Sequence, residues 1–198
     1  MVSPDVSVFQ WINGLAGRSR PVDWVMGTLA TDYLIPVILA LVLLGLWFGA
    51  PDRDSRTRYH RAVMVACVGL ALTSLAVQII SHLSPWPRPF LAGHEVILNP
   101  YFYPPHDPSF PSNTAAIGMT VAAAVLLGGL RRLGLALLGL AFTYSFSRVY
   151  SGVHYPVDVL GGWAIGWGVT LSVSYILLPL AGPVQSIFIR VLRFLRVA

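Results

Sequence analysis

Five long apolar runs set the strongest limit on what this chain can fold into. A membrane-spanning helix needs about 20 predominantly apolar residues, and the runs cover Tyr33–Phe48, His60–Leu83, Ser112–Leu130, Leu133–Tyr150 and Pro156–Leu180. Of the 198 residues, 56% are hydrophobic and 11% are charged, whereas a soluble domain carries about 25% charged residues. The sequence therefore predicts an all-α, polytopic helical bundle that is embedded in a membrane as a single domain.

The two ends of the chain have a weaker pattern. Val22–Ala30 is apolar but is interrupted and followed by aspartates, Asp23 and Asp32, so it predicts a partial helix or part of a sixth crossing. We therefore expect five or six transmembrane helices, preceded by interfacial or partial helices in residues 1–31. In residues 183–198, three arginines recur at every third position and predict an amphipathic helix at the membrane surface: Arg190, Arg193 and Arg196.

The basic residues predict an orientation. Arginines gather in Pro51–Arg61, after the third run and in the C-terminal tail, and with five crossings these regions share one side. Because basic loops face the cytoplasm, the long loop Ser84–Pro111 and the short loop Ser151–Tyr155 are expected to face outward. These arginines account for the net charge of +5, so no nucleic acid is expected as a partner. His60 lies among them and is expected to be solvated.

The short outer loop contains a pattern suited to nucleophilic chemistry. "SRVYSGVHYPVDVLGG" places Ser147, Arg148, His154 and Asp158 in the spacing S-R-x5-H-x3-D. Pro156 favours the start of a helix, which puts Asp158 in its first turn. The carboxylate can then accept a proton from one ring nitrogen of His154 and leave the other nitrogen free as a nucleophile. The alternative is an exposed histidine beside an aspartate that caps a helix.

Two further segments of the outer side could bind an anion. In "SPWPRPF", Arg88 stands between prolines, and an arginine fork is well suited to a phosphoryl group, although it could instead anchor lipid headgroups. In "PSFPSNTAA", Ser112, Asn113 and Thr114 begin an apolar helix whose free N–H groups attract anions, although these residues could simply be caps.

Together the three segments predict a single site. It would contain a nucleophilic imidazole with its carboxylate, two arginines and the N-terminus of a helix. The His, Asp, Glu and Cys residues have no spacing typical of metal ligands, so we expect no metal and no cofactor. Arginines and N–H groups would supply the positive charge for attack on a phosphoryl group.

These residues resemble the signature of the type-2 phosphatidic acid phosphatase superfamily, K-x6-R-P, P-S-G-H and S-R-x5-H-x3-D. The third part is intact, whereas the first retains Arg88 and Pro89 with Ser81 at the lysine position. The second reads P-S-N-T, with Thr114 at the histidine position. The wider pattern, from "FQWINGLAGRS" to "HYPVDVLGG", is similar to the undecaprenyl-diphosphatase branch associated with bacitracin resistance.

The resemblance implies a role for each matching residue. His154 would form a phosphohistidine and Asp158 would orient it. The phosphoryl oxygens would bind Arg88 and Arg148, with help from Ser112 and the first amides of the following helix. The implied reaction is metal-independent hydrolysis of undecaprenyl diphosphate to the monophosphate at the outer side of a bacterial cell membrane, which recycles the lipid carrier of cell-wall synthesis.

Thr114 raises the question of the proton donor, because the family's histidine at this position protonates the leaving oxygen. A lipid alkoxide has a conjugate-acid pKa of about 16 and needs that proton, whereas a phosphate monoester with a pKa of about 6 needs it far less. We therefore expect a preference for diphosphates over monophosphates. Thr114 is a natural divergence, is compensated by His106 or Asp107, or is a substitution that disables turnover; the sequence leaves all three open.

Two alternatives to this function stay open at this point. One is a phosphatase for other lipids, such as phosphatidic acid or phosphatidylglycerol phosphate, and the other is a lipid-binding relative that has lost turnover. Gly162 and Gly166 have small-xxx-small spacing, which is typical of close helix packing. They predict packing within the bundle or, alternatively, a homodimer.

Overall fold

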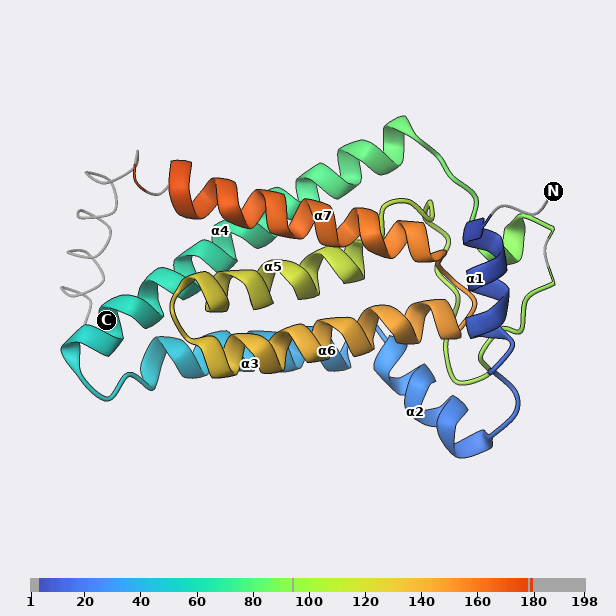
Figure 1. The fold of residues 1–198 in the computed structure, drawn as a ribbon, viewed down its shortest axis with the longest axis horizontal. Coiled ribbons are helices and arrows are strands. Elements are labelled where there is room, and N and C mark those ends of the chain that lie inside the picture. The colour runs from blue at the N-terminus through green and yellow to red at the C-terminus, as the bar shows by residue number, and fades with distance from the viewer. Residues whose placement is uncertain (1–3, 94, 178, 180–198) are drawn as a thin grey trace.

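Each of the five predicted apolar runs contains a helix. The computed structural model describes residues 4–93, 95–177 and 179, and within these residues every regular element is a helix. The elements are α1 (Pro4–Asn13), α2 (Arg20–Ala30), α3 (Leu34–Phe48), α4 (Arg53–Leu83), the 3-10 turn η1 (Pro89–Leu91), α5 (Asn113–Leu127), α6 (Arg131–Tyr150), α7 (Pro156–Ser172) and the π-helical turn η2 (Val173–Leu177). Helices α3 to α7 form an elongated bundle, and α1 lies across one end of it (Figure 1). The all-α fold class is confirmed.

By length and hydropathy, fewer helices qualify as complete membrane spans than the five or six that the sequence predicted. Within the described residues, α4, α6 and α7 with η2 are long and apolar enough to cross a membrane, which gives three spans. Helices α2 and α3 meet these criteria as a pair that is bent by 53° at a short break, which gives up to four. Helix α5 is apolar but has only 15 residues. The five predicted runs therefore match five helices, but not all of these have the length of a complete span.

Helix α5 is the centre of the bundle and packs against α4, α6 and α7. Its sequence is rich in alanine and valine, and the side chains from Val121 to Val125 are fully buried. A Cβ atom at Gly162 of α7 would lie 2.4 Å from the carbonyl oxygen of Ser112. One turn further on, a Cβ atom at Gly166 would lie 2.6 Å from the oxygen of Ala116. The two glycines therefore allow α7 to approach the N-terminal half of α5, which agrees with packing inside the bundle.

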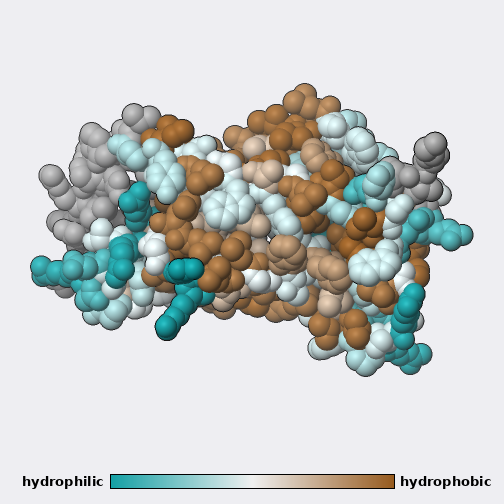
Figure 2. Space-filling view, viewed as in Figure 1, coloured by the Kyte–Doolittle hydropathy of each residue, from teal (hydrophilic) through white to brown (hydrophobic). Residues whose placement is uncertain are grey.

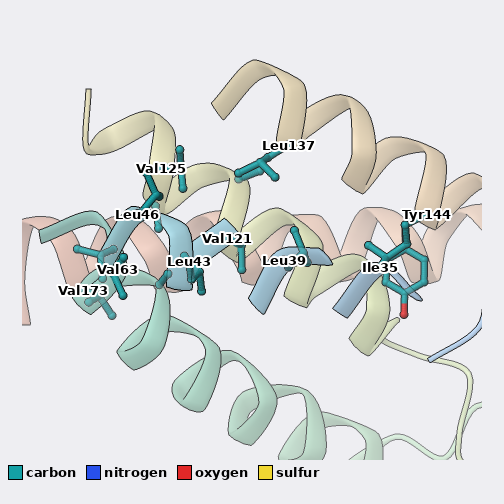
Figure 3. Close-up of a cluster of buried hydrophobic side chains, with 14 residues drawn as sticks. Ile35, Leu39, Leu43, Leu46, Val63, Val121, Val125, Leu137, Tyr144 and Val173 are labelled. Carbon is teal, nitrogen blue, oxygen red and sulfur yellow. The ribbon is translucent and has the colours of Figure 1, made fainter. Parts of the chain in front are cut away.

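Helices α3, α4, α5 and α6 share an aliphatic core. Figure 3 shows side chains from these helices converging on one another, with Leu39, Leu43 and Val121 near its middle. On the outside, hydrophobic residues cover the middle of the bundle and hydrophilic residues gather toward its two ends (Figure 2). Large exposed side chains such as Leu41 and Leu75 are 60% and 57% accessible. This distribution is that of a membrane protein.

The end with the exposed arginines differs in two ways from the sequence prediction. Most of Pro51–Arg61, predicted to be a loop, forms the first turns of α4, because Asp52 accepts a hydrogen bond from the Ser55 amide at 2.8 Å and caps the helix. The prediction that His60 is solvated is wrong. Its ring stacks on Trp47 with centroids 4.2 Å apart, and Nε2 lies 3.0 Å from the Trp47 carbonyl oxygen. The predicted amphipathic helix at 183–198 lies outside the described residues.

Candidate active site

The long loop before α5, the short loop between α6 and α7 and the start of α5 line a polar cavity. These segments lie at the end of the bundle where α1 and α2 are found (Figure 1). Its volume is about 180 Å³. Five of the residues predicted for the site line it: Arg88, Asn113, Thr114, Arg148 and His154. The other lining residues are Asp32, Pro105 and Asp107. The structure thus brings together residues from four separate parts of the sequence.

His154 follows α6 by a short turn and is only 2% exposed. Its Nδ1 lies 3.4 Å from Oδ2 of Asp158, which is in the first turn of α7. The same carboxylate oxygen accepts hydrogen bonds from the Tyr155 amide at 2.8 Å and from the Ser109 hydroxyl at 2.5 Å. Asp158 is therefore fixed by the start of its own helix and by the long loop, and it can hold the imidazole with its proton on Nδ1.

The surroundings of His154 keep its imidazole neutral. Burial lowers the pKa of His154 from its usual 6.5 to about 4. The hydrogen bond with Asp158 opposes this shift, while the charges of Arg88 and Arg148 reinforce it. At neutral pH the ring nitrogen that is not bonded to Asp158 is therefore unprotonated and has the lone pair that a nucleophile requires.

Arg88 is 2% exposed, and each of its five guanidinium N–H groups has a protein acceptor. Nε donates to the Asp107 carbonyl oxygen at 2.7 Å and Nη2 to its carboxylate at 3.0 Å. Nη1 donates to the Val153 carbonyl oxygen at 2.9 Å and lies 3.3 Å from Nε2 of His154. A longer contact of 3.5 Å joins Nη2 to the Pro108 carbonyl oxygen. These contacts fix the guanidinium beside Nε2 of His154.

Arg148 approaches the cavity from the end of α6 and is 3% exposed. Its Nη1 donates to the Ala30 carbonyl oxygen at 2.6 Å and to Asp32 at 3.1 Å, so the break between α2 and α3 holds it in place. The guanidinium also lies 4.9 Å above the ring of Phe102. Its Nε is buried and has no hydrogen-bond acceptor within the described residues. Arg148 thus keeps a donor that Arg88 does not.

The start of α5 also lines the cavity, beside the histidine and the two arginines. Ser112 caps the helix by accepting from the Ala115 amide at 3.4 Å, and its hydroxyl lies 3.0 Å from that of Thr114. Asn113 and Thr114 line the cavity, whereas Ser112 does not. Pro89 and Ser147 also lie outside the lining. Ser147 instead donates to the Tyr144 carbonyl oxygen inside α6 at 2.7 Å.

Sequence reasoning missed two residues that position the site. Asp32 holds Arg148, and the signal was an acidic residue between two apolar stretches, which had been interpreted only as a break in a span. Ser109 supports Asp158, and no pattern marks it. Of the two alternative proton donors, Asp107 lines the cavity, whereas His106 does not and lies 3.5 Å from the Tyr103 hydroxyl.

Residues 62–180 match the sequence model of the PAP2 superfamily, which covers more than half of the chain and all the predicted motifs. The chain belongs to the PAP2 superfamily. It is 33% identical over 159 residues to the undecaprenyl-diphosphatase BcrC of Bacillus subtilis (strain 168), a match that covers 80% of this chain and 76% of that protein. This PAP2 protein is accordingly a membrane lipid phosphatase, as its sequence predicted.

Two solved structures have a similar fold. LpxE of Aquifex aeolicus superimposes with a TM-score of 0.67 at 24% identity, covering 86% of this PAP2 chain and 94% of that protein. A PAP2-type phosphatidylglycerolphosphate phosphatase of Bacillus subtilis superimposes with a TM-score of 0.56 at 20% identity, covering 86% and 85%. Both likenesses concern the fold alone. Asp32 lies outside the stretch that matches the superfamily, although it faces the cavity.

Proposed function

We propose that this phosphatase hydrolyses a polyprenyl diphosphate, with undecaprenyl diphosphate as its natural substrate, to the monophosphate and inorganic phosphate. The reaction takes place at the outer side of a bacterial cell membrane and recycles the lipid carrier of cell-wall synthesis. The observation that carries the proposal is the neutral, buried imidazole of His154, which lines one cavity together with two arginines and whose Nε2 lies 3.3 Å from one of them. The similarity to a named undecaprenyl-diphosphatase supports the choice of lipid.

The first step is attack by Nε2 of His154 on the terminal phosphorus of the diphosphate. A P–N bond forms while the bridging P–O bond breaks, and the prenyl monophosphate leaves with the electron pair. Nδ1 keeps its proton, and the carboxylate of Asp158 stabilises the positive charge that develops on the ring. A water molecule then attacks the phosphohistidine, the P–N electron pair returns to the ring, and the hydrogens of the water leave on inorganic phosphate.

Arg88 contributes most after the reaction has begun. In the free enzyme its Nη1 faces Nε2 of His154 at 3.3 Å. When Nε2 forms its bond to phosphorus it stops accepting that hydrogen bond, and the N–H group can turn to an oxygen of the same phosphoryl group. The interaction is then stronger in the transition state than in the ground state, which is the condition for catalysis. Arg148, whose Nε has no acceptor among the described residues, binds the substrate before attack.

With Thr114 in place of a general acid, the substrate preference depends on whether the leaving group needs a proton. Its hydroxyl lies 3.0 Å from that of Ser112 and cannot protonate an alkoxide. The two carboxyl groups of the cavity lining are both held by arginines, Asp107 by Arg88 at 3.0 Å and Asp32 by Arg148 at 3.1 Å. A prenyl monophosphate, with a relevant pKa of about 6, leaves without a proton. The site therefore suits a diphosphate better than phosphatidic acid or phosphatidylglycerol phosphate, whose hydrolysis expels an alcohol.

The test compares phosphate release from a polyprenyl diphosphate and from phosphatidic acid by the purified chain in metal-free buffer. We expect the diphosphate to react faster. Thr114→His should accelerate phosphatidic acid more than the diphosphate, by up to about 10²–10⁴-fold, the contribution of a general acid. His154→Ala should abolish both reactions. Equal rates on the two lipids in the unmodified chain would overturn the proposed substrate, and release that survives His154→Ala would overturn the mechanism.

A further inference from the structure

A second, larger cavity runs along the membrane-facing side of α3, α4 and α5. Its volume is about 540 Å³, compared with about 180 Å³ for the active-site cavity. Its lining is almost entirely apolar, with Ser74 and Cys67 as the exceptions. Leu44 lines it and is 54% exposed, so the cavity is a groove that is open toward the surrounding lipid. We call it the α3–α4 groove.

One face of each wall helix forms this groove. On α3 the lining begins at Pro36 and ends at Trp47, with residues at intervals of three and four, which is one side of a helix. On α4 the lining residues have the same spacing: Val63, Cys67, Leu70 and Ser74. At 1.5 Å per residue, the wall from Pro36 to Trp47 is about 16 Å long. It thus follows roughly half of the 30 Å hydrocarbon core of a membrane.

Two helices connect the groove to the active site. On α5, Asn113 and Thr114 line the active-site cavity, and Ile117 and Val121 line the groove. Steps of three, four and seven residues from Thr114 and Asn113 stay on one side of the helix, so the same face of α5 leads from one cavity to the other. Pro36, in the first turn of α3, follows four residues after Asp32, which contacts Arg148 in the active site. Figure 3 shows Val121 directed toward Leu39 and Leu43 of α3.

We propose that the α3–α4 groove binds the hydrocarbon chain of the substrate while its phosphates occupy the arginine-lined cavity. This inference rests on the proposed function, because it assigns a place to the polyprenyl part of that lipid. The two cavities together match an amphiphile: a small polar chamber with buried cations, followed by a long apolar channel. Lipids of the surrounding membrane can also contact the groove, but their binding would not depend on a diphosphate group in the active-site cavity.

The test fills the groove and varies the length of the chain. Ala40→Trp and Ser74→Trp place an indole on opposite walls, and Leu41→Trp and Leu75→Trp are matched controls at the next positions, which do not line the groove. For a long polyprenyl diphosphate we expect the groove variants to raise KM by about tenfold or more, the cost of a misfit in an apolar pocket. For a short, water-soluble prenyl diphosphate their kcat/KM should be unchanged, which also shows that the active site has folded.

Cys67 gives a readout that does not depend on turnover. It is the only cysteine in the sequence, it is exposed and it lines the groove. In detergent, a polyprenyl diphosphate should slow alkylation of Cys67 by N-ethylmaleimide, whereas inorganic diphosphate should not. Protection without phosphate release would support the groove and refute the proposed function. Phosphate release from the long lipid without protection of Cys67 would overturn the proposed role of the groove and leave the proposed function intact. The same conclusion would follow if the groove variants had the same KM as their controls.

Discussion

Each end of the bundle has an aspartate at the start of a helix, but the two aspartates do different work. Asp52 caps α4 at the arginine-rich end, is exposed to solvent and accepts hydrogen bonds from the amide and the hydroxyl of Ser55. Asp158 begins α7 at the cavity end and is 0% exposed. Its Oδ2 accepts from the Tyr155 amide at 2.8 Å and also faces His154. Asp52 is the N-cap residue of its helix, whereas Asp158 is the third residue of α7 and accepts from the N-cap amide while it also supports the imidazole.

The arginines differ in the same way. Those at the α4 end are exposed, and solvent and salt screen their charges: Arg53, Arg56, Arg58, Arg61, Arg131 and Arg132. Arg88 and Arg148 are 2% and 3% exposed and are held by carbonyl and carboxylate groups. Because charges interact more strongly where water is excluded, the buried pair can act on a phosphoryl group in a way that the exposed arginines cannot. Burial, more than residue type, distinguishes the two ends.

The largest expected effect comes from the aspartates. In Asp158→Asn an amide N–H can face the imidazole and move its proton to the nucleophilic nitrogen. We expect phosphate release to fall by about 10⁴-fold, as when a triad aspartate becomes asparagine. Asp52→Asn should leave the rate unchanged, because asparagine is an equally good N-cap. The test measures steady-state rates of phosphate release for both variants, with thermal unfolding as the control for folding. Equal losses of rate would contradict the proposed difference between the two aspartates.

A smaller effect is expected from the arginines. Arg88→Lys keeps the charge but loses the fork that contacts Asp107, Val153 and His154 together. Loss of a preorganised donor costs about 10²–10³-fold in kcat, so we expect a loss of that size. Arg56→Lys, at an exposed position of α4, is the matched control and should retain full activity. Comparable losses in kcat for the two variants would mean that burial is not what distinguishes them.

Much of the fold could be predicted from local patterns. The apolar runs located α3 and α6 to within two residues, because hydrophobicity and helix-breaking residues act over short distances. The start of α4 was placed seven residues too late, since its first turns carry arginines and look like a loop. His60 was expected in solvent for the same reason, yet it stacks on Trp47, which lies 13 positions away in sequence. Contacts of this kind follow only from the tertiary arrangement.

The candidate site was predictable in its members but not in its connections. The motifs identified His154, Arg88 and Arg148, which line one cavity. They did not indicate that every N–H group of Arg88 already has an acceptor, because those acceptors are mostly backbone carbonyl groups that lie 19 or more positions away in sequence. Nor did they indicate Asp32, which reaches Arg148 across 116 positions of sequence. Spacing reports which side chains are available, whereas packing decides what each one contacts.

The most direct test of the account is to trap the covalent intermediate. The chain would be mixed with a polyprenyl diphosphate labelled at the terminal phosphorus, quenched with alkali and mapped by mass spectrometry, at about pH 7.5 and about pH 5.5. We predict an acid-labile phosphoryl group on His154 at both values, because burial lowers the pKa of His154 to about 4 and keeps the ring neutral, whereas an ordinary histidine protonates near 6.5. Phosphate release without label on His154, or label that disappears as the pH falls through 6.5, would contradict it.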